Sequence, residues 1–179
     1  MSETLRTMAR KHAEHTRERL TDQAREYDRD GEVPLPGYAG SLTAFALAVA
    51  AVTAAGRRTG CGLPDRYEIA DLGLGALATH KFTRLVSKGS VTSPLRAPFT
   101  EFEEAAGSAE LNESARGGRV RHTVGELLTC PFCLGQWVGT GYVAGLTLAP
   151  RPTRAWAAVF AVTGVSDMLQ QVYARLRDD

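Results

Sequence analysis

Charged residues are absent from three long stretches of this chain, and this segregation limits the folds that it can adopt. No Asp, Glu, Lys or Arg occurs in residues 33–56, 127–150 or 155–166. An uncharged run of about 20 residues is long enough to cross the hydrocarbon core of a bilayer as a helix. The sequence therefore predicts an all-α fold, a small polytopic membrane protein with three or four apolar helices.

Two of these predicted helices leave alternatives open. The first apolar segment, Tyr38–Gly56, is rich in alanine rather than leucine, so the buried helix of a soluble protein is the competing interpretation. Residues 67–86 have a short uncharged centre with Asp71 before it and Lys81 after it. They form either a span that neighbouring helices shield or a helix in the plane of the membrane.

The distribution of charge divides the chain into two parts. Residues 1–37 are a charged N-terminal tail with a proline-rich linker, and residues 38–174 are the helical membrane domain. Within that domain, residues 87–126 form a polar connector. We expect a short helix to start in Glu101–Glu104 and a loop over residues 107–121, which are rich in Gly, Ser and Asn. The net charge of +1 gives no support for a nucleic-acid partner.

Two of the three cysteines lie at the start of an uncharged run. Cys130 and Cys133 flank Pro131 and Phe132, and a proline after a capping residue predicts a helix N-terminus at this point. The positive end of the helix dipole favours the thiolate of Cys130. The pair is a candidate thiol-redox or zinc site, but zinc needs four ligands and one such pair supplies two. An inert, packed pair is the favoured interpretation.

Ionisable residues next to the apolar segments form a second candidate site. Charge inside a membrane is costly, so such side chains usually face the protein interior and pair. We therefore expect a buried polar cluster, either a proton or ion relay or, as we favour, a group that fixes helix packing. Its candidate members are Asp71, His80, Arg84, Glu126 and Asp167.

Glycine spacing marks a candidate packing surface in residues 127–150. Gly135 and Gly139 are four residues apart, and so are Gly141 and Gly145. This spacing lets helices approach closely in lipid. The expected partners are the lipid bilayer and either a second copy of the chain or another membrane protein.

The basic residues predict the orientation. Half of the Lys and Arg residues outside the tail, seven of 14, lie in residues 81–121, and loops rich in Lys and Arg face the cytoplasm. The prediction is an inner-membrane protein with Cys130 and Cys133 facing the cytoplasm. With four spans Cys61 lies on the opposite side, whereas with three spans it can approach the pair.

Three motifs in order carry a family resemblance. They are ATHKFTRLV at residues 78–86, VTSPLRAPF at residues 91–99 and GELLTCPFCL at residues 125–134. Together they resemble an uncharacterised bacterial membrane-protein family, domain of unknown function 1360, over residues 39–173. The resemblance implies a helical integral membrane protein and supplies no established activity.

The leading functional hypothesis is therefore a non-catalytic structural or partner-binding membrane module, for which we predict no cofactor. The alternative is a thiol-redox or metal-handling membrane protein that uses Cys130 and Cys133. The sequence contains no Walker loop, dinucleotide fingerprint or HExxH motif, so nucleotide-dependent and zinc-protease activities lack support.

Overall fold

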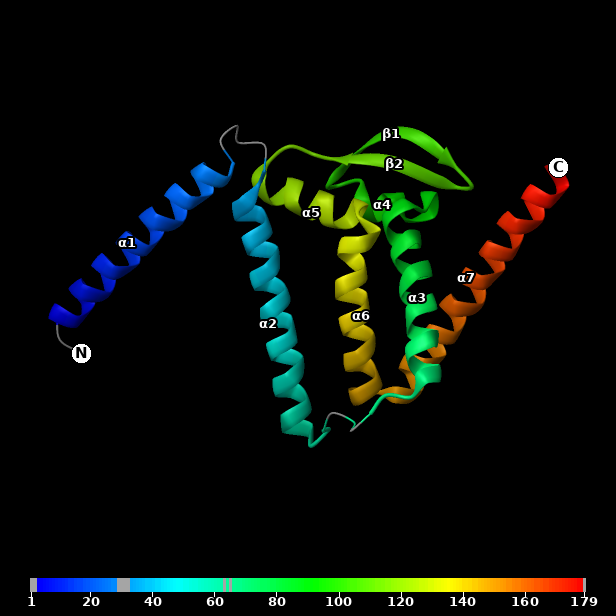
Figure 1. Ribbon diagram of the computed structural model, residues 1–179, viewed down its shortest axis with the longest axis horizontal. Coiled ribbons are helices and arrows are strands. Elements are labelled where there is room, and N and C mark those ends of the chain that lie inside the picture. Colours follow the sequence, from blue (N-terminus) through cyan, green and yellow to red (C-terminus); the bar gives the residue numbers. More distant parts are fainter. Residues whose placement is uncertain (1–2, 29–32, 63, 65, 179) are drawn as a thin grey trace. The chain divides into compact units, whose positions relative to one another are not determined.

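The computed structural model describes residues 3–28, 33–62, 64 and 66–178, and it divides the chain into two compact units, Met1–Gly40 and Ser41–Asp179. Within the described residues the chain is mostly helical, with one small sheet (Figure 1). The elements are α1 (Glu3–Tyr27), α2 (Leu35–Thr59), α3 (Ile69–Lys88), η1 (Ser90–Thr92), α4 (Ser93–Arg96), β1 (Thr100–Gly107), β2 (Glu110–Ala115), α5 (Arg119–Thr129), α6 (Pro131–Leu148) and α7 (Pro150–Asp178).

The first unit consists of α1 and the first turns of α2. The described side chains of α1 are almost all exposed, including Met8, Leu20 and Tyr27. After α1, the Val33 N–H donates a 2.9 Å hydrogen bond to Asp28 Oδ2. The linker expected before residue 38 is shorter than predicted, because α2 already starts at Leu35 and proline is tolerated in a first helical turn. Residues 29–32 at the end of the charged tail lie outside the described residues.

The helix α2 is the one described helix that is long and apolar enough to cross a membrane. By length and composition, the prediction of three or four such helices is therefore not confirmed. A core helix of a soluble protein also passes this test, but such a helix is mostly buried. Only 6% of the most apolar window of α2 is buried, so α2 presents its apolar side chains outward along nearly its whole length.

Three helices form a packed helical core in the second unit, namely α3, α6 and α7. Figure 1 shows α3 and α6 side by side. The Tyr142 ring of α6 fills the space over Gly75 of α3, where a Cβ atom would lie 2.1 Å from Tyr142 Cε1. The Tyr142 hydroxyl donates a 2.8 Å hydrogen bond to the Asp71 carbonyl. Between α3 and α7, the Phe82 ring packs edge-on against Trp156.

The polar connector is folded, and we call residues 89–129 the cap. It comprises η1, α4, the β1–β2 hairpin and α5, and it lies at one end of the helical core (Figure 1). The all-α prediction is wrong here, and so are the helix expected at Glu101–Glu104 and the loop expected over residues 107–121. The strands pair antiparallel, with Thr100 opposite Ala115 and Phe102 opposite Glu113.

A turn of three residues with positive φ closes this hairpin. Gly107, Ser108 and Ala109 have φ angles of 77°, 48° and 60°. Only glycine adopts such angles without steric cost, so the fold must stabilise the turn from outside it. Part of that support is visible next to the turn, where the Ser90 N–H donates a 2.9 Å hydrogen bond to the Ala109 carbonyl.

Candidate functional site

The cysteine pair lies where the cap meets the helical core. Cys130 is the N-cap of α6 with Pro131 in the first turn, as the sequence predicts, and Cys130 Sγ accepts a 3.2 Å hydrogen bond from the Cys133 N–H. Cys130 is half-buried, Cys133 is exposed, and both are free thiols. The Cys130 sulfur therefore serves as a helix cap.

The surroundings of the second thiol disfavour its ionised form. Although the Cys133 residue as a whole is exposed, desolvation of its thiol group raises the pKa of Cys133 to about 11, and the hydrogen bond and charge of Cys130 act in the same direction. A thiol with such a pKa carries almost no thiolate at neutral pH. The spacing of the pair alone gives no sign of this, because it depends on the atoms packed around the sulfur.

The metal hypothesis needs further ligands beside the pair. Among the residues that the structure describes, no group of three or more His, Cys, Asp or Glu side chains is placed to hold one ion. A zinc site on Cys130 and Cys133 therefore stays a prediction. Cys61 lies far from the pair, since Gly56 near the end of α2 is beside Leu148 at the last turn of α6. The pair lies at the first turn, about 27 Å away along an 18-residue helix.

The five residues predicted to form one polar cluster are not brought together. Asp71 accepts two hydrogen bonds from Arg154, at 2.8 and 2.6 Å, at the end of the core remote from the cap. Asp167 pairs with Lys81. These ion pairs join α3 to the start and the middle of α7.

The other three members lie elsewhere. Arg84 pairs with Glu110 of β2, with its Nε 3.0 Å from Glu110 Oε1. Glu126 Oε1 lies 3.5 Å from His122 Nε2, one turn away on α5. His80 is exposed, and its side chain makes no hydrogen bond or ion pair with the described residues. Helical spacing separates Asp71 from Arg84 by about 20 Å along α3, so no single site can hold both.

The most completely hydrogen-bonded charged group is not a member of the predicted cluster. Arg96 has 0% of its surface exposed. Its Nε and Nη2 atoms each donate a 2.8 Å hydrogen bond to the carboxylate of Glu113, whose side chain is 6% exposed. Its Nη1 donates to the carbonyls of Val86 and Gly89 and to the Thr92 hydroxyl, at 2.7, 3.0 and 2.7 Å.

This buried pair joins the cap to the end of α3. The Thr100 hydroxyl donates a 2.9 Å hydrogen bond to Glu113 Oε2, so residues from α4, β1 and β2 meet at one carboxylate. Burial raises the pKa of Glu113, but the hydrogen bonds from Arg96 and Thr100 and the charge of Arg96 outweigh it and leave the pKa below its usual range. Arg96 is thus enclosed and does not reach solvent.

The four glycines of the predicted packing surface have different surroundings. Gly145 lies against α7, where a Cβ atom would lie 2.6 Å from Thr153 Oγ1. A Cβ atom on Gly135, Gly139 or Gly141 would meet no atom within 4 Å. A shallow groove follows this open side of α6, lined by Gly135, Gln136, Gly139, Thr140 and Val143.

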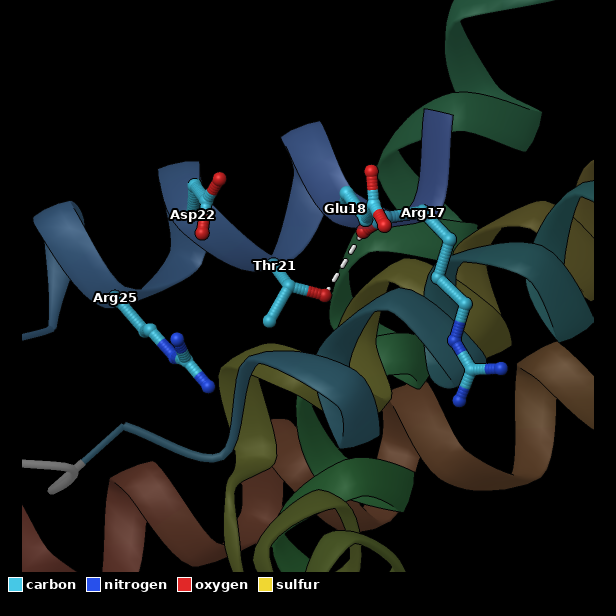
Figure 2. Close-up of a pocket in the computed structure, with 5 residues that line it drawn as sticks. All are labelled: Arg17, Glu18, Thr21, Asp22 and Arg25. Carbon is cyan, nitrogen blue, oxygen red and sulfur yellow. Dashed lines mark hydrogen bonds between the residues drawn. The ribbon is translucent and has the colours of Figure 1, made fainter. Parts of the chain in front are cut away.

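A second shallow surface lies on α1 and carries no built site. Figure 2 shows the side chains along it, all from this one helix, and the hydrogen bond that it draws runs from the Thr21 hydroxyl to the Arg17 carbonyl, 2.8 Å. One helix cannot enclose a ligand. The surface is lined by Arg17, Glu18, Thr21, Asp22 and Arg25.

Comparison with known proteins gives a family without an assigned activity. The family of proteins of unknown function DUF1360 matches residues 74–173. Sporulation protein YjcA of Bacillus subtilis (strain 168) is 26% identical over 103 residues, which is 56% of this chain and 87% of YjcA. No solved structure matches. The chain belongs to the DUF1360 family, and the matched region contains most of the helical core and the whole cap.

Proposed function

We propose that this protein is an integral membrane protein that acts without catalysis, by presenting a helical core and a folded cap to partner molecules. The observation that carries the proposal is the exposure of α2. Its apolar window is 6% buried, and exposing such a helix to water is costly because each buried CH₂ group gains about 0.8 kcal/mol. A bilayer removes this cost.

The exposed side of the helical core also favours a bilayer environment. Val159, Val162, Val165 and Leu169 of α7 are large apolar side chains that are exposed in the described chain. Soluble monomers rarely expose continuous apolar surface on this scale. The aromatic contact between Phe45 of α2 and Trp137 of α6, with ring centroids 5.1 Å apart, places α2 beside the core.

The charged groups of the core support a structural role. Asp71 and Asp167 each pair with a basic residue. In a membrane such pairs are costly to separate and hold helices in register. One relative, YjcA, is by its name a sporulation protein.

We propose the open side of α6 as the contact for a further transmembrane helix. Gly135 and Gly139 allow close approach, and Gln136 and Thr140 can donate hydrogen bonds across a helix pair. The helix can come from a second copy or from another membrane protein.

We further propose that the cap and the cysteine pair face the cytoplasm. The cap and the end of α3 carry the Lys and Arg residues that, by the positive-inside rule, favour the cytoplasmic side. Cys61 lies at the other end of α6 from the pair.

A cysteine-accessibility map tests this arrangement. One variant retains Cys61 alone, and a second carries Glu103→Cys, an exposed position on β1, in a cysteine-free background. A membrane-impermeant maleimide should label Cys61 on intact cells and label Glu103→Cys only after permeabilisation. Labelling of both positions from one side, or release of the protein from membranes by alkaline carbonate, would contradict the proposal.

A further inference from the structure

Two of the four arginines of the cap, Arg96 and Arg116, already have partners within the chain, and so does Arg84 in the neighbouring part of α3. Arg84 pairs with Glu110, Arg96 is enclosed by Glu113, and Arg116 Nε donates a 2.6 Å hydrogen bond to the Thr100 carbonyl. Two arginines differ from these. The side chains of Arg119 and Arg121 are exposed and make no hydrogen bond or ion pair with any described residue.

These two arginines flank an exposed apolar side chain in the first turn of α5. Val120 is 74% exposed. At 100° per residue, Arg119 and Arg121 leave the helix on either side of Val120. The apolar stripe continues through Val124 and Leu127, which are half-buried.

The stripe lies at the level where the cap meets the helices. Figure 1 shows α5 lying across the end of α6. Phe132, in the first turn of α6, is 91% exposed. Val120 on α5 and Phe132 on the adjoining α6 are therefore both exposed apolar side chains in this part of the chain.

We propose that the first turn of α5 is a docking surface for the headgroups of anionic phospholipids, with Val120 inserted between the lipids and Arg119 and Arg121 bound to their phosphates. The inference rests on the proposed membrane function and names its lipid partner. An apolar stripe flanked by arginines is the arrangement that holds a helix in the membrane interface. The guanidinium group binds phosphate through paired hydrogen bonds.

The charges of this surface favour an anionic lipid. Two uncompensated arginines favour an anionic headgroup, and Val120 between them favours a surface with an apolar interior rather than a fully polar one. Each basic side chain near an anionic membrane contributes about fivefold to binding. The interaction should weaken with salt, since headgroup charges are screened within about 10 Å at moderate ionic strength.

The test compares the thermal unfolding midpoint of the full chain in vesicles of phosphatidylcholine and in vesicles that also contain phosphatidylglycerol. We expect phosphatidylglycerol to raise the midpoint of the wild type at low salt and less so at high salt. Arg119→Gln with Arg121→Gln should lose this rise. Arg119→Lys with Arg121→Lys should keep part of it, which separates charge from misfolding.

The matched control is Arg175→Gln with Arg177→Gln, the same charge change at exposed positions near the end of α7. It should retain the full rise. The inference is overturned if the Arg119 and Arg121 glutamine variant keeps the rise, if the control loses it equally, or if the wild type has the same midpoint in both lipids, as expected for arginines that bind an acidic protein. A chain that does not float with either kind of vesicle refutes the membrane proposal instead.

Discussion

Removing Arg96 should detach the cap from the end of α3. The Glu113 side chain is 6% exposed, and the substitution Arg96→Ala leaves its carboxylate with the Thr100 hydroxyl as its remaining side-chain donor among the described residues. It also removes the donor that satisfies the carbonyls of Val86 and Gly89. Breaking a buried ion pair on one side costs about 3 to 5 kcal/mol.

The same strand offers a matched control for this prediction. Arg84 also pairs with a glutamate of β2, but the side chains of Arg84 and Glu110 are 46% and 26% exposed. Exposed pairs contribute about 0 to 1 kcal/mol. Arg84→Ala removes an arginine–glutamate pair from the same hairpin, so the difference between the two variants isolates the effect of burial.

Hydrogen exchange of the hairpin amides, residues 100–115, is the appropriate assay because it reports opening of the cap separately from the helices. We expect Arg96→Ala to accelerate exchange about a hundredfold or more, and Arg84→Ala about fivefold at most. A double replacement, Arg96→Met with Glu113→Leu, should recover part of the protection, since apolar substitutes often match a buried ion pair but the Val86 and Gly89 carbonyls still lack the Arg96 donor. Equal exchange in the two single variants would refute the argument.

Three further outcomes follow from the same geometry. The stabilising effect of Glu113 is fully present above the ordinary glutamate pKa of about 4.3 and is lost as the pH falls through its lower folded pKa. Hydrogen exchange of the hairpin amides during acid unfolding should show this loss of stability. The substitution Glu113→Gln should make the stability of the hairpin less dependent on pH. Gly75→Ala should destabilise the core by about 1 to 3 kcal/mol by displacing the Tyr142 ring, whereas Gly73→Ala, which meets no atom within 4 Å, should be neutral or stabilising by up to about 1 kcal/mol in thermal unfolding. Alkylation of Cys133, followed by mass spectrometry in a Cys61→Ser variant that keeps Cys130, should be slow at neutral pH and rise toward pH 10; rapid labelling of Cys133 at pH 7 would contradict the raised pKa.

The elements that the sequence predicts correctly are those with local signals. The start of α6 follows from a capping residue and a proline that act within one turn. The hairpin has no comparable signal, since β1 contains Glu101, Glu103 and Glu104 and no Val or Ile, and such residues are uncommon in strands. Its strands are held by Arg96, which reaches Glu113 across 17 positions of the chain.

The ion pairs show a second limit of sequence reasoning. The sequence identifies Asp71 and Asp167 as charges next to apolar segments, but their partners depend on how α7 packs along α3. Arg154 and Lys81 lie 83 and 86 positions away from them. A one-turn shift of α7 would give each aspartate a different neighbour, so composition and spacing cannot select between one cluster and several pairs.

The family match and the candidate membrane helix cover different parts of the chain. The match begins at residue 74, inside α3, and omits α2, whereas α2 is the described helix with the length and composition to cross a membrane. The matched residues of this chain contain most of the helical core and the whole cap, including Arg96 and Glu113. A buried charged network destabilises a fold unless every member is hydrogen-bonded. Here the hydrogen-bonded network fixes the cap over the end of the core. In this chain the family match therefore covers the cap and most of the core that Arg96 and Glu113 join, whereas α2, the candidate membrane helix, lies outside it.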